Sequence, residues 1–358
     1  MCATSKMVLS FRTELIKKFQ DNGYQVSVSA FDGEKAKEIE GLGVSFYCMD
    51  DNNRSTNPLK ILSLKNKYKK LIQQVKPDVV LTFMLKPNVF GPLACKSLGV
   101  KKVFSMVEGA GDVFVNNGLK WKIIRAVVCH LYRRSFKHVK KVFFLNNDDK
   151  CEFVGRRLVK EDCAQVINGI GVNLDKFKFS PVTKKAKFLM VSRLVETKGV
   201  IEYCKCAKEV KKLYPDAVFD LVGGEGALKK EDIKEYIDDG SIVYHGETND
   251  VMPYLEDSSV FVLPTYREGF PVSVMEAQSV GRVVIISNAV GCKATVKDGY
   301  NGFFAPVKDV NALKDRCIYF IENPEKAVEM GKNAREFAQE NFDHKKINQQ
   351  LFEIIERV

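Results

Sequence analysis

The sequence predicts an α/β protein of two doubly wound domains, each with a parallel sheet covered by helices. Two observations support this fold class. Apolar runs typical of buried strands alternate with helical patterns along the whole chain, and 358 residues are enough for two hydrophobic cores. A polar, basic stretch with a proline at 176–187 marks the seam. We therefore expect domains at 1–178 and 179–340, followed by a C-terminal helix within 341–358.

The expected strands are rich in β-branched and aromatic residues and are bounded by turn-forming residues. They lie at 77–84, 101–107, 141–146, 186–193, 217–224, 241–246, 259–265 and 282–288. The chain opening differs, because a helix-then-strand pattern is clear from Phe11 onward but only about four residues precede the first loop, where a strand of about five or six is usual. The first strand is therefore predicted to be short, or the chain start to be trimmed.

Charge is distributed unevenly along the chain. Residues 1–180 contain 31 Lys and Arg against 17 Asp and Glu, a net charge of +14, whereas the remainder contains 25 against 28, a net charge of −3. The first domain should therefore prefer an anionic partner, such as a membrane surface or a nucleic acid. Two basic stretches with helical spacing, 60–76 and 120–141, are as compatible with ordinary solvated helices as with membrane contact.

The ten cysteines form no CxxC pair and have no histidine partners at zinc spacing. Such scatter is typical of free thiols in a reducing cytoplasm. The sequence also contains no secretory signal and no apolar run of about 18 residues, so no segment is predicted to span a bilayer.

The stretch "YREGFPVSVMEA", residues 266–277, follows a predicted strand and begins a predicted helix, with Pro271 expected at the first helical position. Helix starts carry unpaired N–H groups, so this loop can receive an anion or a phosphorylated ligand. Glu268 and Glu276 would then face the crevice at the carboxyl edge of the sheet, where open α/β folds bind ligands. The alternative is that Glu268 caps the helix and Glu276 lies on a solvated face.

Arg193 and Lys198 lie five residues apart, at the end of one strand and the start of the next helix. Two cations in that position suit a diphosphate, Arg as a fork of donors and Lys as a point charge, although both are equally compatible with ordinary surface residues. "LVGGEGALKK" lacks the full G-x-G-x-x-G spacing and is weak evidence for a dinucleotide site. No D-x-D triplet occurs, so no metal site and no cofactor are expected.

Together these segments resemble glycosyltransferase family 4, retaining enzymes of GT-B fold. "YREGFPVSVMEAQSVGRVVIISNAVGCKATVKDGYNGFFAP" looks like the family's nucleotide-sugar motif, "VSRLVETKG" its diphosphate-binding segment and "NGIGVNLDKF" its domain seam. "VLTFMLKPNVFGPLACKSLGV" and "VEGAGDVF" resemble the bacterial branch that builds capsule, O-antigen and related lipid-linked glycans. The resemblance implies two Rossmann-like domains facing a cleft, with the C-terminal helix crossing back to the first domain.

The resemblance also implies roles for the residues of the second domain. Glu268, with the backbone N–H groups of Gly269 and Phe270, would hold hydroxyls of the donor sugar, and Glu276 would bind the ribose hydroxyls. By the same resemblance, Arg193 and Lys198 would bind the diphosphate. The backbone from Tyr244 to Gly246 would border the uracil of a UDP-sugar.

Many relatives place a histidine near the reacting carbon in the first domain. Here the corresponding loop "VEGAGDVF" has none, and Glu108 is the nearest ionisable candidate; the alternative is a carboxylate bound to a backbone amide. The opening loop "SKMVLSFR" also lacks the glycines that many relatives use near the donor phosphate.

The sequence thus predicts a cytoplasmic enzyme, peripheral on the inner face of a bacterial membrane. It would move a hexose or N-acetylhexosamine from a UDP-sugar to a polyprenyl-diphosphate-linked glycan. A UDP-sugar epimerase of the same fold and a catalytically incomplete partner subunit are the alternatives. A nucleic-acid partner would explain the basic charge but not the two glutamates or the Arg193–Lys198 segment. The oligomeric state is not predicted.

Overall fold

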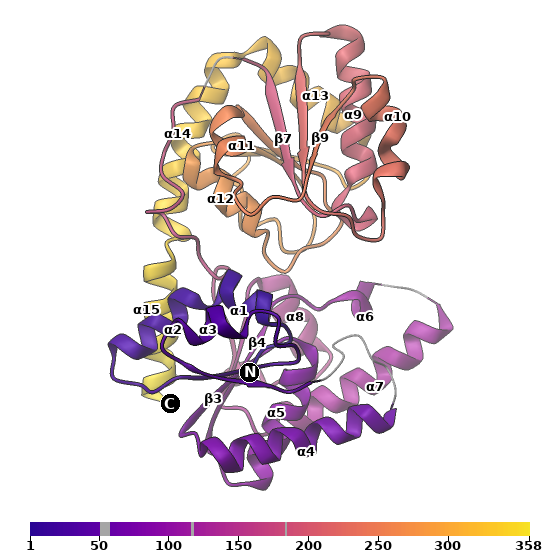
Figure 1. Cartoon of the computed structure of the whole chain (residues 1–358). Coiled ribbons are helices and arrows are strands. Elements are labelled where there is room, and N and C mark those ends of the chain that lie inside the picture. The colour runs from indigo at the N-terminus through magenta and orange to yellow at the C-terminus, as the bar shows by residue number, and fades with distance from the viewer. Residues whose placement is uncertain (51–57, 116–117, 183–184) are drawn as a thin grey trace. The chain divides into compact units, whose positions relative to one another are not determined.

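The computed structural model describes residues 1–50, 58–115, 118–182 and 185–358, without the side chains of 58–62, 112 and 115. The chain forms two compact units (Figure 1). The first comprises Met1–Ile170 and Lys345–Val358, and the second comprises Gly171–His344. Each unit contains parallel sheet covered by helices, and the α/β fold class is confirmed.

The first unit contains a four-stranded parallel sheet in the order β3-β4-β5-β6 and a separate parallel pair, β1-β2. The strands predicted at 77–84, 101–107 and 141–146 correspond to β3, β4 and β5. Six strands are described in this unit: β1 Ser27–Ala30, β2 Ser45–Cys48, β3 Val79–Phe83, β4 Lys102–Val107, β5 Lys141–Phe144 and β6 Ala164–Val166.

The first three residues lie between β1 and β3 and are hydrogen-bonded to both. The Met1 ammonium donates to the Leu81 carbonyl at 2.8 Å, and the Cys2 N–H donates to the Ser29 carbonyl at 2.8 Å. The opening segment therefore acts as a very short connecting strand. Elsewhere along β1 and β3, the two strands border a cavity of about 630 Å³.

Helices cover the sheets of the first unit, and α5 packs against both α4 and α7. The basic stretches predicted to be helical are α4 and α7. The helices are α1 Ser5–Phe11, α2 Thr13–Asp21, α3 Ala36–Glu40, α4 Pro58–Val75, α5 Leu85–Ser97, α6 Asp112–Val115, α7 Leu119–Phe136, α8 Asn147–Gly155, η1 Glu161–Cys163 and α15 His344–Arg357. Phe352 of α15 contacts Phe19 and Tyr24, with ring centroids 5.3 and 6.1 Å away, and this aromatic cluster holds α15 against α2.

The second unit is one six-stranded parallel sheet in the order β12-β11-β10-β7-β8-β9. All five strands predicted here are present, and β12 is an addition. The strands are β7 Lys187–Val191, β8 Val218–Val222, β9 Val243–Gly246, β10 Val260–Leu263, β11 Val283–Ser287 and β12 Gly302–Ala305. The helices are η2 Glu196–Lys198, α9 Val200–Leu213, η3 Lys230–Ile233, α10 Lys234–Asp238, α11 Met252–Asp257, α12 Val272–Val280, α13 Val310–Glu322 and α14 Pro324–Asn341.

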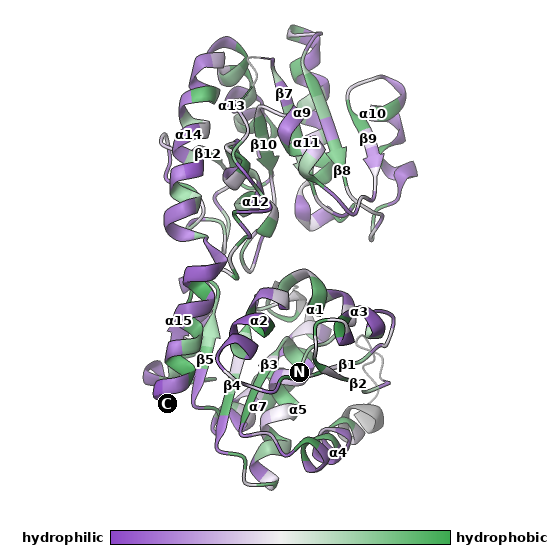
Figure 2. Ribbon diagram, turned by 60° about the vertical axis from the view of Figure 1, so that its left-hand side comes forward, coloured by the Kyte–Doolittle hydropathy of each residue, from purple (hydrophilic) through white to green (hydrophobic). Residues whose placement is uncertain are grey.

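The strand order reverses between β7 and β10. From β7 the chain proceeds outward through β8 and β9, then returns to β10 on the other side of β7 and proceeds through β11 and β12. The loops that leave the carboxyl ends of β7 and β10 therefore diverge, and this is the place where open α/β sheets bind ligands. Figure 2 shows the hydrophobic strands of both sheets lying among helices.

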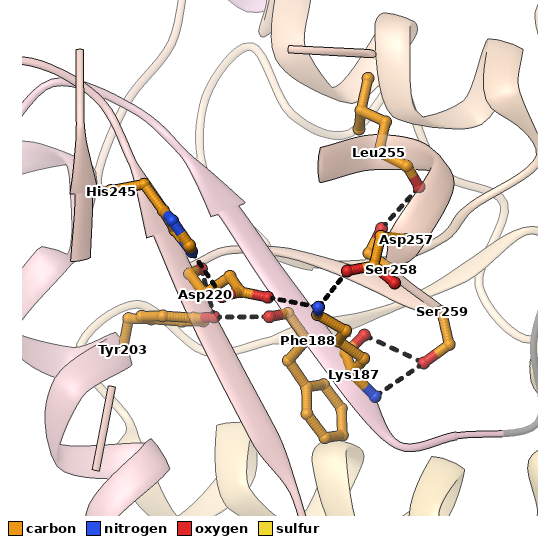
Figure 3. Close-up of polar contacts among 9 residues, drawn as sticks. All are labelled: Lys187, Phe188, Tyr203, Asp220, His245, Leu255, Asp257, Ser258 and Ser259. Carbon is orange, nitrogen blue, oxygen red and sulfur yellow. Dashed lines mark hydrogen bonds and ion pairs between the residues drawn. The ribbon is translucent and has the colours of Figure 1, made fainter. Parts of the chain in front are cut away.

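One acid lies inside the second sheet. Asp220, in the middle of β8, is 5% exposed. The His245 Nε2 lies 2.6 Å from its Oδ1, and the Lys187 Nζ lies 3.3 Å from its Oδ2 (Figure 3). Lys187 is also paired with Asp257. Because a buried carboxylate is costly unless it is paired, these partners explain how an otherwise apolar strand carries an acid.

The division between the units lies at Ile170/Gly171, upstream of the predicted 178/179 boundary, and the second division lies at His344/Lys345 rather than at 340/341. Hydrogen bonds explain both positions. The Val172 N–H donates to the Phe342 carbonyl at 2.8 Å, and the His344 N–H donates to the Val172 carbonyl at 3.2 Å. The two chain segments thus pair within the second unit. The polar composition of 176–187 had predicted the seam between the domains there. Phe177 in this stretch is buried, so the stretch is part of the second unit.

Candidate functional site

The candidate site lies at the carboxyl edge of the second sheet, on the loops that follow β7 and β10. The Tyr266 N–H and the Thr265 Oγ1 both donate to the Thr197 carbonyl, at 2.8 and 3.0 Å. Gly199 completes this junction with φ +76°, and a Cβ there would lie 2.0 Å from the Pro264 carbonyl oxygen. Only glycine allows the two loops to approach so closely in this conformation.

Lys198 and Glu268 meet across this junction. The Lys198 Nζ donates to both Glu268 carboxylate oxygens, at 2.6 and 2.7 Å, and the Glu268 side chain is only 9% exposed. The backbone holds Glu268 in place, because its N–H donates to the Val290 carbonyl at 3.0 Å and Gly291 lies against its carbonyl. An ammonium has three N–H donors, so this pair leaves one for an anionic ligand.

Glu276 lies in the second turn of α12 and is half-buried. Burial raises the pKa of its carboxyl to about 7, and the positive charge of Lys176 offsets part of that effect. No hydrogen-bond partner for this carboxyl is present among the described residues, so its oxygens are available to a ligand with hydroxyl groups. Pro271, predicted at the first helical position, is instead the N-cap of α12, with an extended ψ of 101°.

The other predicted residues of this unit follow adjacent strands along the same edge. Arg193 is exposed just after β7, and the neighbouring Leu194 N–H donates to the Gly224 carbonyl, 2.9 Å away, after β8. The Tyr244 hydroxyl donates to the Gly223 carbonyl at 2.8 Å, and the Gly223 N–H donates to the Gly246 carbonyl at 2.8 Å. The loops after β7 and β8 and the end of β9 therefore form one continuous rim.

Gly269 and Phe270 connect Glu268 to α12. Phe270 is buried, and its ring makes a T-shaped contact with Phe342 at a centroid distance of 5.6 Å. Its side chain therefore belongs to the core of the unit, so any part it plays at the site falls to its backbone, as predicted. The structure thus brings Lys198 and Glu268 into direct contact and places the other predicted residues of this unit along the same sheet edge.

Sequence reasoning missed two features of this edge. Tyr266 donates from its hydroxyl to the Glu202 Oε1 at 2.7 Å, and the Lys308 Nζ lies 4.6 Å from the centre of the Tyr266 ring. These residues are far apart in the sequence, and no pattern connects them. The close approach at Gly199 was also missed, although a glycine at the end of "VETKG" is a local signal for a left-handed residue.

In the first unit, Glu108 follows β4 and forms an ion pair with Arg12, between α1 and α2. The Arg12 guanidinium lies 4.1 Å from the centre of the Phe83 ring, and burial lowers its pKa to about 10. The partner of the Glu108 carboxylate is thus the Arg12 guanidinium. As the alternative to a catalytic role, the sequence analysis had expected this carboxylate to bind a backbone amide. The second oxygen, Oε2, is buried and has no hydrogen-bond partner among the described residues.

Within the described ranges, no three His, Cys, Asp or Glu side chains gather in a way that would hold a metal ion. None of the helices described combines the length and apolar character needed to cross a bilayer.

Two family models match the chain, one for each unit. "Glycosyl transferases group 1" matches residues 172–337, which include the whole candidate edge, and "Glycosyl transferase 4-like" matches residues 2–146. The chain thus consists of a glycosyl transferase 4-like domain followed by a group 1 glycosyltransferase domain. The predicted family and the prediction of an enzyme are thereby confirmed.

Two bacterial relatives of this glycosyltransferase carry specific names. It is 29% identical over 365 residues to the N,N'-diacetylbacillosaminyl-diphospho-undecaprenol alpha-1,3-N-acetylgalactosaminyltransferase of Campylobacter jejuni, covering 98% of this chain and 96% of the relative. It is 29% identical over 286 residues to the UDP-Gal:alpha-D-GlcNAc-diphosphoundecaprenol alpha-1,3-galactosyltransferase of Escherichia coli, covering 74% and 72% of the two chains.

Solved structures confirm the GT-B fold. A glycosyltransferase of Rickettsia africae superposes with a TM-score of 0.79 at 20% identity, covering 100% of this chain and 96% of that one. The Anabaena protein HepE, solved in complex with UDP, has a TM-score of 0.79 at 18% identity, with coverage of 100% and 99%.

The junction at Gly199 generates a stability prediction. Replacing Gly199 with Ala should lower the free energy of unfolding by about 3 kcal/mol, because the new methyl group overlaps a backbone carbonyl in addition to straining φ. Gly240→Ala is the matched control, since Gly240 has φ +73° but no atom within 4 Å of the Cβ position. It should cost only about 1 kcal/mol. Equal losses in urea unfolding would contradict the close approach.

The raised pKa of Glu276 generates a pH prediction. Below the unfolded-state pKa, near 4.5, the carboxyl is neutral in both the folded and the unfolded chain, so its burial carries no charge penalty. As the pH rises from there through the folded-state pKa of about 7, the penalty develops fully and the free energy of unfolding falls. Glu276→Gln should therefore stabilise the ligand-free enzyme by about 2 kcal/mol more at pH 8 than at pH 4.5.

Urea unfolding from pH 4.5 to 8 measures this difference, with Glu231→Gln at an exposed position as the control for removing one negative charge. A Glu276→Gln difference that does not change with pH would mean that the carboxyl is as well solvated in the folded as in the unfolded chain.

Proposed function

We propose that this glycosyltransferase moves a hexose or N-acetylhexosamine from a UDP-sugar to a polyprenyl-diphosphate-linked glycan, with retention of configuration. The observation that carries the proposal is the Lys198–Glu268 pair at the switch point of the second sheet, with the partly buried Glu276 on α12, the helix that follows the Glu268 loop. The names of the Campylobacter and Escherichia relatives support the acceptor class, because both describe transfer to a diphospho-undecaprenol-linked sugar.

The donor occupies the carboxyl edge of the second unit. Glu276 binds the ribose hydroxyls. They supply the hydrogen bonds that its carboxyl lacks within the described part of the chain, and so offset part of the cost of burial. Arg193 and Lys198 bind the diphosphate. The backbone from Tyr244 to Gly246 borders the uracil at the end of the same rim.

Glu268 and the backbone N–H groups of Gly269 and Phe270 bind the sugar hydroxyls. Since Glu268 already accepts two hydrogen bonds from Lys198, the lysine fixes its orientation. The same ammonium lies next to the sugar-binding carboxylate, where it stabilises negative charge that develops on the departing diphosphate.

In the transfer step, the bond from the anomeric carbon to the diphosphate oxygen breaks, and a bond from that carbon to the acceptor hydroxyl oxygen forms on the same face. The hydroxyl proton passes to an oxygen of the departing diphosphate, and the products are UDP and the extended glycan. Lys198 and Arg193 supply the positive charge for this step without a metal ion. In the first unit, Glu108, held by Arg12, is the proposed ionisable residue on the acceptor side.

The enzyme is proposed to act in the cytoplasm, peripherally on the inner face of the membrane, where an anionic surface carries its acceptor. The excess of positive charge in residues 1–180 supports an anionic partner, and the two glutamates and the Arg193–Lys198 segment favour a membrane-linked acceptor over nucleic acid.

Transfer is tested by mass spectrometry. The enzyme is incubated with a panel of UDP-sugars, in the presence and in the absence of chelator, and with and without a lipid extract that carries diphosphate-linked glycans. We expect one donor to add a sugar-sized mass to the lipid. Conversion of the donor without lipid would indicate the epimerase, and no change with any donor would favour the incomplete subunit. Loss of transfer on addition of chelator would contradict the metal-independent step.

Variants separate the two glutamates. Glu268→Gln should lower kcat about 100-fold, because it disrupts the group that orients the sugar and anchors Lys198. Glu276→Gln should raise the KM for the donor about tenfold with little change in kcat, because ribose binding is the same in the ground and transition states. Glu231→Gln is the matched control. A Glu276→Gln variant with unchanged KM would remove this residue from the donor site.

A further inference from the structure

Helix α7 of the first unit has two different halves. Its C-terminal half is anchored by buried residues, Val128, Cys129, Tyr132, Ser135 and Phe136, and the helix packs against α5. Its N-terminal half exposes three large apolar side chains: Leu119 is 76% exposed, Ile123 59% and Val127 54%. These residues are four positions apart, so they form one stripe along the helix. We call Leu119, Ile123 and Val127 the apolar stripe.

The stripe is unusual for this molecule. Among the described residues, seven large apolar side chains are exposed, and the other four, Phe179, Leu213, Val243 and Val307, lie on four different segments of the second unit. Isolated exposed apolar residues are normal on a protein surface, whereas an aligned group marks an interaction site. Figure 1 shows α7 at the periphery of its unit, beyond α5.

The charged residues of α7 itself are all positive. Helix α7 contains no Asp or Glu, and exposed Lys120 and Lys122 flank the stripe in the first turn. Exposed Arg133 and Arg134 continue the basic surface near the other end. A second copy of this chain at the same face would bring two such helices together, and their like charges would repel. An anionic lipid bilayer suits both the apolar stripe and the exposed lysines, because it has an apolar layer beneath negatively charged headgroups.

We infer that the N-terminal half of α7 inserts into the interface of an anionic lipid bilayer. The apolar stripe lies at the boundary of the acyl chains, and Lys120 and Lys122 extend to the headgroup phosphates. The inference rests on the proposed function for its purpose, since an enzyme with a lipid-linked acceptor must reach the bilayer. The binding itself is measured without any sugar transfer.

A tryptophan in the stripe reports its insertion. Trp121 is the only tryptophan of the chain, but it lies two residues after Leu119, on the other side of the helix from the apolar stripe, and its side chain is half-buried. The full-length protein with Trp121→Phe and Ile123→Trp is therefore titrated with vesicles of phosphatidylcholine alone or mixed with phosphatidylglycerol. We expect a blue shift of its fluorescence only with phosphatidylglycerol, weakened at high salt, and quenching by lipids brominated on the acyl chains. Binding without quenching would place the stripe outside the bilayer and overturn the inference.

Matched variants test the stripe and the charges separately. Leu119→Ser, Ile123→Ser and Val127→Ser together should weaken vesicle binding by about tenfold or more, because three apolar side chains no longer enter the interface. Leu213→Ser is the control, since Leu213 is 63% exposed but lies at the end of α9 in the second unit, and it should bind as the parent does.

Lys120→Gln with Lys122→Gln should weaken binding to anionic vesicles and reduce its salt dependence. Parent-like binding by the stripe variant would overturn the inference. So would light scattering that shows a dimer of the parent and a monomer of the stripe variant in the absence of lipid, because the stripe would then be an interface between copies.

The inference and the proposed function fail separately. Transfer to a detergent-dispersed acceptor without binding to vesicles would refute the insertion of α7 and leave the function standing. Insertion of the Ile123→Trp reporter without transfer from any donor would support α7 as a membrane contact and refute the proposed reaction.

Discussion

The reversal of strand order between β7 and β10 is the constraint on which the rest of the second unit depends. The strands are parallel, but successive strands are added on one side of β7 and then on the other, so the loops after β7 and β10 lead away from each other. Open α/β sheets bind their ligands in the crevice between such loops. Gly199 then brings the two loops into contact at Pro264. The Lys198–Glu268 pair spans that contact, so the backbone approach and the ion pair form a single arrangement.

The two glutamates at this edge are held in different ways. Glu268 is nearly buried but is paired with Lys198, which compensates its charge. Glu276 has no such partner among the residues that the structure describes, and its raised pKa reflects the cost of keeping that carboxyl away from water. A ligand with hydroxyl groups can repay that cost, whereas the paired glutamate presents an oriented carboxylate. The same residue type is thus prepared for two tasks by its surroundings.

The first unit is organised around positive charge in two different environments. Arg12 is buried against Phe83 and ties the start of the chain to Glu108 at the end of β4, so it acts within the protein. The lysines of α7 are exposed beside an apolar stripe and act outward. Net charge alone does not separate these roles, because it counts a buried, paired guanidinium and a solvated ammonium equally.

The strands were predictable because buried parallel strands are continuous apolar runs, and all eight that were expected are present. Three short strands that are not buried throughout, β2, β6 and β12, were missed. The boundary at Ile170 was also missed, because it depends on hydrogen bonds between residues more than 160 positions apart. Glu108 was singled out as the nearest ionisable candidate in its loop, but its partner was not predictable, since Arg12 lies in a distant part of the chain.

The sequence by itself determined the fold class, the family and the residue types along the site, because local periodicity and motif spacing are properties of neighbouring positions. Only the tertiary structure decided that Lys198 reaches Glu268, that Glu276 has no hydrogen-bond partner among the described residues, and that the apolar stripe of α7 is exposed. Pairing and burial depend on what other parts of the chain bring to a side chain, and strand order rather than chain order decides those neighbours.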